Sequence, residues 1–396
     1  RFKEDSKVTD LLYLCKSQIE HKVPVAQLFQ VICDRFNAEK LNLNVDIDLQ
    51  SELTEIEKNL KAGASADYIA SRGEYLNAKI IAAYLGYEFV DASELVKFSD
   101  KGKFLEKATD IAIREELSKY EQAVIPGFYG ARPDGSIQTF SRGGSDITGA
   151  LVARAVGADM YENWTDVSGF LMADPRIVDD PKPIATVSYK ELRELSYMGA
   201  SVLHEDAIYP ARVANIPINI RNTNRPDDPG TIITSEPGEL KEGQIISGIA
   251  GNKNFTVLNM YKNQMSDMRG FIRRTAAIFE DHGVPIEHMP SGVDTLSVVV
   301  ANKHLGNELE DIKDDIMNQL KPDTLDIEDN VALIATVGHG MSSKVGVAAR
   351  LFGALATEKV NIKMIDQGSS EMNIIVGVKN DEFEVAIRAI YKAFEN

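Results

Sequence analysis

The second half of this chain repeats itself. When the sequence is shifted by 76 positions, residues 255–301 overlay residues 331–377 without a gap. Identity between the copies is low, but apolar and glycine positions coincide throughout. Each copy has the pattern of a strand, a loop, a helix, two strands and a final helix, the last at 305–319 and 381–393. This βαββα unit is close to half of a ferredoxin-like sandwich, so we expect two small, paired α+β domains.

Paired domains of this kind can act as a scaffold or as a ligand sensor. We favour the sensor, because the loops at 263–270 and 339–346 hold glycine where a helix begins and where backbone N–H groups can face a ligand. The polar, turn-rich stretch at 222–243 separates this half from the first half and predicts a domain boundary.

The first half alternates strands with helices after a mainly helical start. Helices are expected at 9–21, 24–36, 51–61, 65–70, 73–85, 102–118, 146–157, 188–197 and 204–214, and strands at 87–92, 122–130, 136–140, 158–166 and 217–222. This order predicts an α/β domain with a mostly parallel sheet sandwiched by helices. Ligands in such domains bind at the carboxyl ends of the strands, where the segments 127–130, 141–146 and 165–166 are expected.

The segment Ser141-Arg142-Gly143-Gly144-Ser145-Asp146 combines bare backbone with charge. Two glycines let a ligand approach the N–H groups, Ser145 or Asp146 can cap the helix that follows, and Arg142 offers a planar cation for a carboxylate or phosphate. The pattern fits an anion cradle for a zwitterion or a phosphate, and equally an ordinary strand-to-helix turn.

Composition narrows the choice of partners. The 396 residues carry a formal net charge of -17, which disfavours binding to a nucleic-acid backbone. No apolar run approaches the ~20 residues of a membrane span, and no signal peptide is present. Cys15 and Cys33 have no disulfide or metal-ligand spacing, and the six histidines form no metal cluster, so we expect a cytoplasmic protein without a protein-bound metal site.

Taken in order along the chain, several motifs resemble those of monofunctional aspartate kinases. They are Val8-Thr9-Asp10-Leu11-Leu12, Ser71-Arg72-Gly73-Glu74, Gly127-Phe128, Ser141–Asp146, Trp164-Thr165-Asp166-Val167 with Gly169, Asp174-Pro175-Arg176, Gly199-Ala200 with Val202-Leu203-His204, and Pro229-Gly230-Thr231. The resemblance implies an amino-acid-kinase (carbamate-kinase-like) catalytic domain over 1–235, a linker at 236–243, a first ACT domain at 253–328, and a second ACT domain formed by 244–252 and 329–396.

The resemblance also implies a reaction, in which ATP with Mg²⁺ phosphorylates the β-carboxylate of L-aspartate at the first step of lysine, threonine and methionine biosynthesis. The implied catalytic residues are Arg142 for the α-carboxylate, Glu74 for the ammonium group, and Asp146. Phe128, Gly143, Gly144 and Ser145 would bind the substrate, and Thr165, Asp166, Leu171, Arg176 and Ser201 would contact ATP. Taken alone, Glu74 is as well explained as a dipole partner at a helix start, and 174–176 as a turn.

Two departures from the family pattern stand out. The family's Lys-Phe-Gly-Gly strand and loop is absent and belongs upstream of Arg1, so we expect the sequence to be a fragment; loss of that lysine would cost several kcal/mol of transition-state stabilisation. Many members also have lysine where this chain has Ser201, which cannot supply the same charge to a nucleotide phosphate.

The repeated half resembles the lysine-responsive branch of the family. The resemblance implies feedback inhibition by L-lysine, a homodimer through the ACT domains and in some members a dimer of dimers. The effector residues implied by position are Met265, Arg269, Gly270, Phe271, Ile272, Ile286, Glu287, Ser291, Gly292, Val293 and Asp294. Glu287 or Asp294 could hold the lysine ammonium, although either is equally a solvated turn residue.

Two alternatives stay open. The first is a related kinase with another acidic acceptor such as N-acetylglutamate, whose acetylated amine gives Glu74 no ammonium to hold. The second is an amino-acid-binding regulatory protein without kinase activity, which the missing lysine loop favours and the charged residues Glu74, Arg142, Asp146 and Asp166 disfavour.

Overall fold

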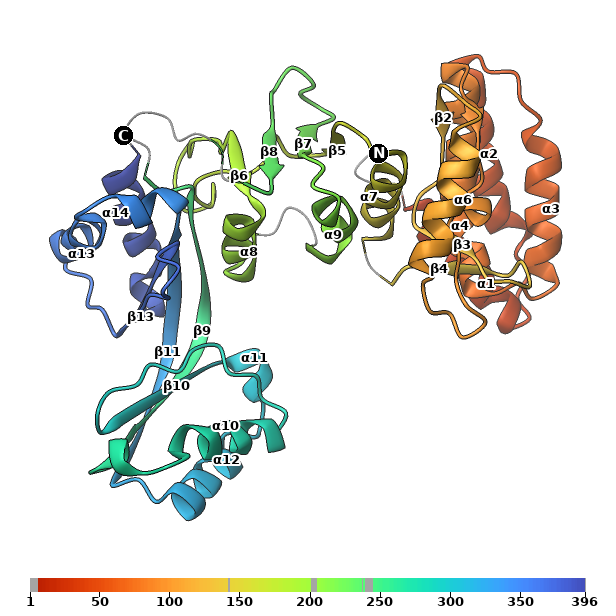
Figure 1. The fold of residues 1–396 in the computed structure, drawn as a ribbon. Helices are drawn as coiled ribbons and strands as arrows, with labels where there is room; N and C mark the ends of the chain where they lie inside the picture. The colour runs from red at the N-terminus through yellow and green to blue at the C-terminus, as the bar shows by residue number, and fades with distance from the viewer. Residues whose placement is uncertain (1–5, 142, 201–204, 237, 239–244, 396) are drawn as a thin grey trace. The chain divides into compact units, whose positions relative to one another are not determined.

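The computed structural model describes residues 6–141, 143–200, 205–236, 238 and 245–395 (Figure 1). The chain forms two compact units, one of residues 1–163 with 203–218 and the other of residues 164–202 with 219–396. The division falls inside the region predicted to be catalytic, because residues 164–202 pack with the C-terminal half.

The first unit begins with a layer of four helices: α1 (Val8–Glu20), α2 (Ala26–Leu43), α3 (Leu49–Lys61) and α4 (Ala66–Leu85). Asp48 caps α3 by accepting a hydrogen bond from the Ser51 N–H, and Ser65 caps α4 in the same way through Tyr68. Their apolar faces meet in a shared core that includes Leu12, Phe29, Ile32, Leu53 and Leu76.

Helix α4 differs from the sequence-based expectation of two helices at 65–70 and 73–85. Residues 66–85 form one continuous helix, and Gly73 lies inside it. Gly73 faces α1, where a Cβ atom on it would come within 3.3 Å of Val8 Cγ1. The glycine therefore serves helix packing and does not break the helix. Glu74 consequently lies in mid-helix, so its alternative interpretation as a partner of a helix N-terminal dipole is wrong.

The remainder of the first unit is built from short strands and helices: β1 (Glu88–Phe89), α5 (Ala92–Leu95), α6 (Glu106–Leu117), β2 (Ala123–Val124), β3 (Tyr129–Ala131), β4 (Ile137–Thr139), α7 (Gly144–Val156) and α9 (Glu205–Val213). β1 pairs with β2 in parallel, and β3 and β4 form an antiparallel hairpin. The strand predicted at 122–130 is interrupted between β2 and β3 at Pro126 and Gly127, because proline cannot donate a ladder hydrogen bond.

A four-stranded sheet has the order β5-β7-β8-β6, formed by β5 (Tyr161–Thr165), β7 (Ile218–Asn222), β8 (Thr231–Thr234) and β6 (Thr186–Ser188). β6 runs directly into α8 (Tyr189–Tyr197) through a capping box, in which Ser188 and Glu191 bond each other's backbone N–H groups.

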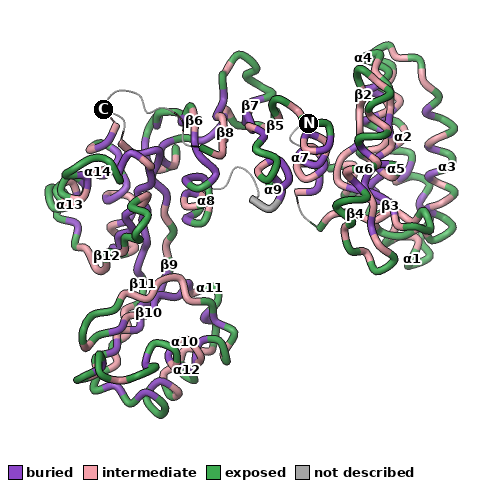
Figure 2. The backbone as a smooth tube through the Cα atoms, viewed as in Figure 1, coloured by how far each residue is buried: buried purple, intermediate pink, exposed green. Residues whose placement is uncertain are grey.

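The repeated half shares one antiparallel sheet of order β10-β9-β11-β13-β12. β9 (Gly248–Tyr261) and β11 (Thr324–Val337), each 14 residues long, serve both copies. Residues 255–261 of β9 pair with β10 (Thr295–Ala301) on one side and with β11 on the other, and residues 248–252 pair with the end of β11. On its other side β11 pairs with β13 (Asn373–Lys379), which pairs with β12 (Met364–Asp366). Residues 331–337 of β11 are buried throughout (Figure 2).

Helices cover this sheet in each copy: α10 (Phe271–Asp281), α11 (Asn302–Leu305), α12 (Leu309–Asp315) and η2 (Ile316–Leu320) in the first, and α13 (Val347–Thr357) and α14 (Phe383–Phe394) in the second, with short turns η1 (Met265–Asp267), η3 (His339–Ser343) and η4 (Asn380–Glu382). Gly270 and Gly346 precede α10 and α13 with φ of 76° and 91°, which confirms that these helices begin at glycines. In the first copy the predicted second strand is reduced to single bridges at His288 and Ser291. Within the described ranges, no helix is long and apolar enough to cross a membrane.

Candidate active site

The start of α7 is the centre of the candidate acceptor site. Gly143, with φ of 60°, precedes the helix, and no side chain caps it. The prediction that Ser145 or Asp146 is the N-cap is therefore wrong, because both lie in the first turn. The N-terminus of α7 has no side-chain cap, and Ser145 in its first turn is exposed. Its free backbone N–H groups are therefore suited to an anion. Arg142 lies outside the described residues.

The segment Gly127-Phe128 packs tightly against this helix start. A Cβ atom on Gly127 would lie 2.8 Å from Ser145 Oγ, and one on Gly144 would lie 2.8 Å from Phe128 Cβ. The Phe128 N–H donates to Thr148 Oγ1 on α7 at 3.0 Å. Both glycines are thus needed for the Phe128 loop and α7 to meet.

Asp146 is held in place by β5. Asn163 Nδ2 donates to Asp146 Oδ1 at 2.9 Å and also to the Tyr161 hydroxyl at 3.0 Å. Burial raises the pKa of Tyr161 to about 12, although the hydrogen bond from Asn163 lowers it in part. Asn163 and Tyr161 were not predicted from the sequence; their spacing of i and i+2 places both on one face of a strand that ends at a predicted site.

Helix α4, which carries Glu74, packs against β4 of the hairpin that follows Phe128. The Arg72 guanidinium is buried and lies 5.4 Å from the centre of the Tyr129 ring, and Thr139 Oγ1 donates to Asp67 Oδ1 at 2.6 Å. These contacts join α4 to the β3–β4 hairpin that follows Phe128. The Glu74 side chain is exposed, yet the protein around its carboxyl group partly desolvates it and raises its pKa.

The predicted nucleotide residues lie in the second unit. Thr165 Oγ1 donates to Asp166 Oδ1 at 3.2 Å, and the Thr165 carbonyl accepts from the Thr223 N–H at 2.8 Å. Arg176 forms a two-pronged ion pair with Asp174, with Nε to Oδ1 at 2.9 Å and Nη2 to Oδ2 at 2.5 Å. That hydrogen bonding lowers the pKa of Asp174, while Arg176 remains 87% exposed. Ser201 lies outside the described residues.

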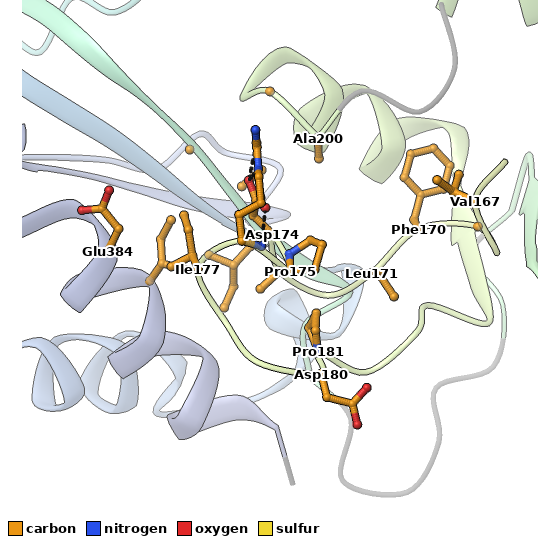
Figure 3. Close-up of a pocket in the computed structure, with 18 of the residues that line it drawn as sticks. Val167, Phe170, Leu171, Asp174, Pro175, Ile177, Asp180, Pro181, Ala200 and Glu384 are labelled. Carbon is orange, nitrogen blue, oxygen red and sulfur yellow. Dashed lines mark hydrogen bonds and ion pairs between the residues drawn. The ribbon is translucent and has the colours of Figure 1, made fainter. Parts of the chain in front are cut away.

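A cavity of about 970 Å³ opens beside these residues (Figure 3). Leu171 and Arg176 line it, whereas Thr165 and Asp166 are not among its lining residues. Its volume is at the upper end of the range for small-molecule and cofactor sites, so it is large enough for a nucleotide.

Helix α8 contacts both copies of the repeat, which the sequence analysis did not foresee. Glu191 Oε1 accepts from the His339 backbone N–H at 2.9 Å and from Ser247 Oγ at 2.6 Å. Burial alone would raise the pKa of Glu191, but hydrogen bonds from Ser188, Ser247 and backbone N–H groups outweigh it and lower the pKa to about 2. The Ser-x-x-Glu spacing predicts the cap but gives no sign of this further contact.

The other contacts of α8 follow at intervals of one turn. Glu194 Oε2 accepts from Asn373 Nδ2 at 2.6 Å in the second copy. The Tyr197 hydroxyl donates to Glu287 Oε2 in the first copy. Burial, followed by this hydrogen bond, raises the pKa of Tyr197 to about 12.

The predicted effector residues occupy several places in the first copy of the repeat. Met265 and Phe271 are buried in one cluster with Ile286 packed against it, and the Met265 N–H donates to Asp294 Oδ1 at 3.2 Å. Gly270 starts α10, Ile272 is 52% exposed and Val293 72% exposed. Glu287 faces Tyr197, and Ser291 and Gly292 lie in the turn before β10, where Gly292 N–H donates to the Thr295 carbonyl. Arg269 directly precedes Gly270.

Among the residues whose placement is described, no group of three or more His, Cys, Asp and Glu side chains could hold a metal ion.

Comparison with known proteins identifies the family. A model of the amino acid kinase family matches residues 30–222, and a model of the ACT domain matches residues 334–394. Aspartokinase 3 of Bacillus subtilis (strain 168) is 36% identical over 409 residues, covering 99% of this chain and 89% of that protein. This chain belongs to the aspartate kinase family.

Solved structures agree. A crystal structure of Clostridium acetobutylicum aspartate kinase superimposes with a TM-score of 0.91 at 51% identity, covering 100% of this chain and 91% of that chain. E. coli aspartokinase III in complex with lysine and aspartate has a TM-score of 0.69 at 21% identity, covers 99% of this chain and 91% of that chain, and shows the shared fold alone. The predicted kinase fold, ACT domains and enzyme class are thus confirmed.

Proposed function

We propose that this aspartate kinase transfers the γ-phosphoryl group of ATP to the β-carboxylate of L-aspartate, the first step towards lysine, threonine and methionine. Three features of the start of α7 support the acceptor most: it has no side-chain cap, holds the Asp146 carboxylate in its first turn, and packs against Gly127-Phe128. The site thus offers both signs of charge to a small zwitterion.

Each acceptor residue then has a defined task. Arg142 would bind the α-carboxylate with two hydrogen bonds. Glu74 would bind the ammonium group through its partly desolvated carboxyl group, and Asp146 would be kept in position by Asn163. Gly143, Gly144 and Ser145 would offer backbone N–H groups, and Phe128 would line the site.

Transfer itself needs little acid–base chemistry. A β-carboxylate oxygen attacks the γ-phosphorus, the bond to the β–γ bridging oxygen breaks, and ADP leaves with the electron pair. Mg²⁺ would neutralise the charge that develops on the transferring phosphates. We propose that the nucleotide occupies the cavity beside Leu171 and Arg176, with Thr165, Asp166 and Ser201 contacting it from outside the cavity lining.

We further propose that L-lysine inhibits the enzyme through the repeated half, with its effector site at the predicted residues around Met265, α10 and the turn at 291–294. Lysine would bind the inactive arrangement more tightly and shift the population towards it. The same half is proposed to form a homodimer through its ACT domains, and in turn a dimer of dimers.

The decisive experiment is an assay of ADP formation by the full-length protein with ATP, Mg²⁺ and either L-aspartate or N-acetylglutamate, with and without lysine. We expect turnover with aspartate and inhibition by lysine. Preference for N-acetylglutamate would identify the related kinase, and turnover with neither acceptor would favour the non-catalytic amino-acid-binding protein.

A further inference from the structure

The walls of the cavity come from two distant parts of the sequence. On one side are the loop at 167–181 and Gly199-Ala200, and on the other are β9 at 249–253 and α14 (Figure 3). Both parts belong to the same compact unit. Any ligand that fills the cavity therefore touches the kinase loop and the regulatory sheet together.

Three cationic side chains line this cavity, and each is paired with a carboxylate. Arg176 pairs with Asp174 at 2.5 Å, Arg225 with Asp228 at 3.4 Å and Lys253 with Glu384 at 2.6 Å. Lys253 is the one of these three that comes from the regulatory half. A polyphosphate that enters the cavity would meet these cations on both walls, beside the lining carboxylates Asp174, Asp180 and Glu384 with which it would compete.

The backbone around Lys253 is fixed on both sides. Asn252, the residue before Lys253, lies against Gly199, whose φ is 101°. A Cβ atom on Gly199 would lie 2.6 Å from Asn252 Oδ1. Gly251 lies against α14, since a Cβ atom there would come within 2.7 Å of Phe383 Cε2. Lys253 therefore stands where β9, α14 and the Gly199-Ala200 segment meet.

The Lys253 ammonium can change partners at small cost. Its side chain is 35% exposed and that of Glu384 is 40% exposed, and ion pairs with this degree of exposure are weak. A compact ammonium on a flexible stem suits a phosphate, which carries more charge than one carboxylate. The centre of the Phe383 ring lies 5.3 Å from Lys253 Nζ, within the range of a cation–π contact.

We propose that Lys253 is a nucleotide-binding residue supplied by the regulatory sheet, which leaves Glu384 and binds a phosphate of ATP in the cavity. This inference rests on the proposed function. It gives ATP and the repeated half a shared residue, so ATP affinity and the arrangement of β9 and α14 must influence each other.

Two substitutions with opposite expected effects test this. In Lys253→Met, the dissociation constant of the non-hydrolysable nucleotide AMP-PNP with Mg²⁺ should rise about tenfold, as expected for loss of a charged hydrogen bond. Glu384→Gln removes the carboxylate that competes with the phosphate for Lys253, so the dissociation constant of AMP-PNP should fall about threefold. Isothermal titration calorimetry on the full-length protein gives both values, and the KM for ATP should follow them while the KM for aspartate stays within about twofold.

A matched pair provides the control. Lys363 and Glu328 form an ion pair in the same regulatory half, with exposed fractions of 23% and 35%, and neither lines the cavity. Lys363→Met and Glu328→Gln should leave the AMP-PNP constant unchanged. Thermal unfolding of all four variants identifies any that fail to fold, and Glu384→Gln decides alone if Lys253→Met is one of them.

The outcomes separate the two proposals. Unchanged AMP-PNP binding in Lys253→Met, or weaker binding in both cavity variants, would overturn the role of Lys253 and leave aspartate kinase activity intact. If the unmodified protein forms no ADP with aspartate, the proposed function fails, whereas the binding series still decides whether Lys253 contacts nucleotide.

Discussion

Glu191 and His339 lie 148 positions apart in the sequence, yet one carboxylate oxygen of Glu191 accepts from both the backbone N–H of His339 at 2.9 Å and its ring Nδ1 at 2.8 Å. Glu191 is also the capping-box residue of α8. A single buried carboxylate therefore joins a kinase helix to the loop before α13 in the second copy of the repeat. Movement of that loop must either carry α8 with it or break these bonds.

Glu191→Gln should destabilise the protein in a pH-dependent way. The folded-state pKa of about 2 lies below the ordinary value of 4.5, so the carboxylate stabilises the fold above pH 4.5 and loses this contribution as the pH falls towards 2. The shift corresponds to on the order of 3 kcal/mol at neutral pH. Urea unfolding followed by circular dichroism should show a large difference from the unmodified protein at pH 7 and a small one near pH 2.

The exposed pair Glu310–Lys313 provides the control for this measurement. Its nitrogen–oxygen distance is 2.7 Å, but the Glu310 side chain is 76% exposed. Glu310→Gln should change the unfolding free energy by less than about 0.5 kcal/mol at either pH. If Glu191→Gln and Glu310→Gln lower the unfolding free energy equally at pH 7, the hydrogen bonds of the buried Glu191 carboxylate do not stabilise the fold more than an exposed ion pair does.

Glu74→Gln tests the ammonium partner of the acceptor. The amide keeps the shape of the side chain but not its charge, so a charge-assisted hydrogen bond to the substrate is lost. Since such a bond is worth roughly 1.5–3 kcal/mol, kcat/KM for aspartate should fall about 10- to 100-fold. The KM for ATP should stay nearly constant in the same steady-state assay. A selective rise in the KM for ATP would place Glu74 at the wrong substrate.

Gly144→Ala tests the close packing between α7 and the Phe128 loop. The added methyl group would lie 2.8 Å from Phe128 Cβ and 2.9 Å from its Cα, so the loop must move. A small displacement of the Phe128 loop at a reacting site can cost about 100-fold in rate, and we expect that loss in kcat/KM for aspartate. Gly353→Ala in α13, where a Cβ meets nothing within 4 Å, should instead be neutral or slightly stabilising. Similar activities of both variants would show that the loop tolerates displacement.

Much of this architecture follows from local patterns. The internal repeat, the glycines at the starts of α10 and α13, and the order of kinase motifs each involve neighbours in sequence or fixed spacings, and these predictions are confirmed at the level of elements and family. The helix break predicted at 71–72 is wrong, because Ser71 and Arg72 continue α4, and Gly73 lets Val8 of another helix come close.

The residues that escaped prediction are those whose partners lie far away in sequence. Asn163 supports Asp146, Glu191 meets His339, and Tyr197 meets Glu287, with no periodicity or motif that links the members of any pair. Such contacts depend on how packed elements meet. A single sequence therefore indicates which elements form and leaves open which of them are joined.

The Tyr197–Glu287 pair gives a test of the proposed lysine site. Substitutions at its two members should shift the lysine concentration for half-maximal inhibition in opposite directions. If Glu287 holds the lysine ammonium, Glu287→Ala should raise the lysine concentration for half-maximal inhibition several-fold and leave uninhibited turnover nearly unchanged. Tyr197→Phe removes the hydroxyl that occupies the Glu287 carboxylate, so it should lower that concentration. Lysine inhibition curves for the two variants at saturating ATP and aspartate provide the measurement. Shifts in the same direction would mean that the Tyr197–Glu287 contact stabilises one conformation and that the ammonium binds elsewhere, with Asp294 then the next carboxylate to replace.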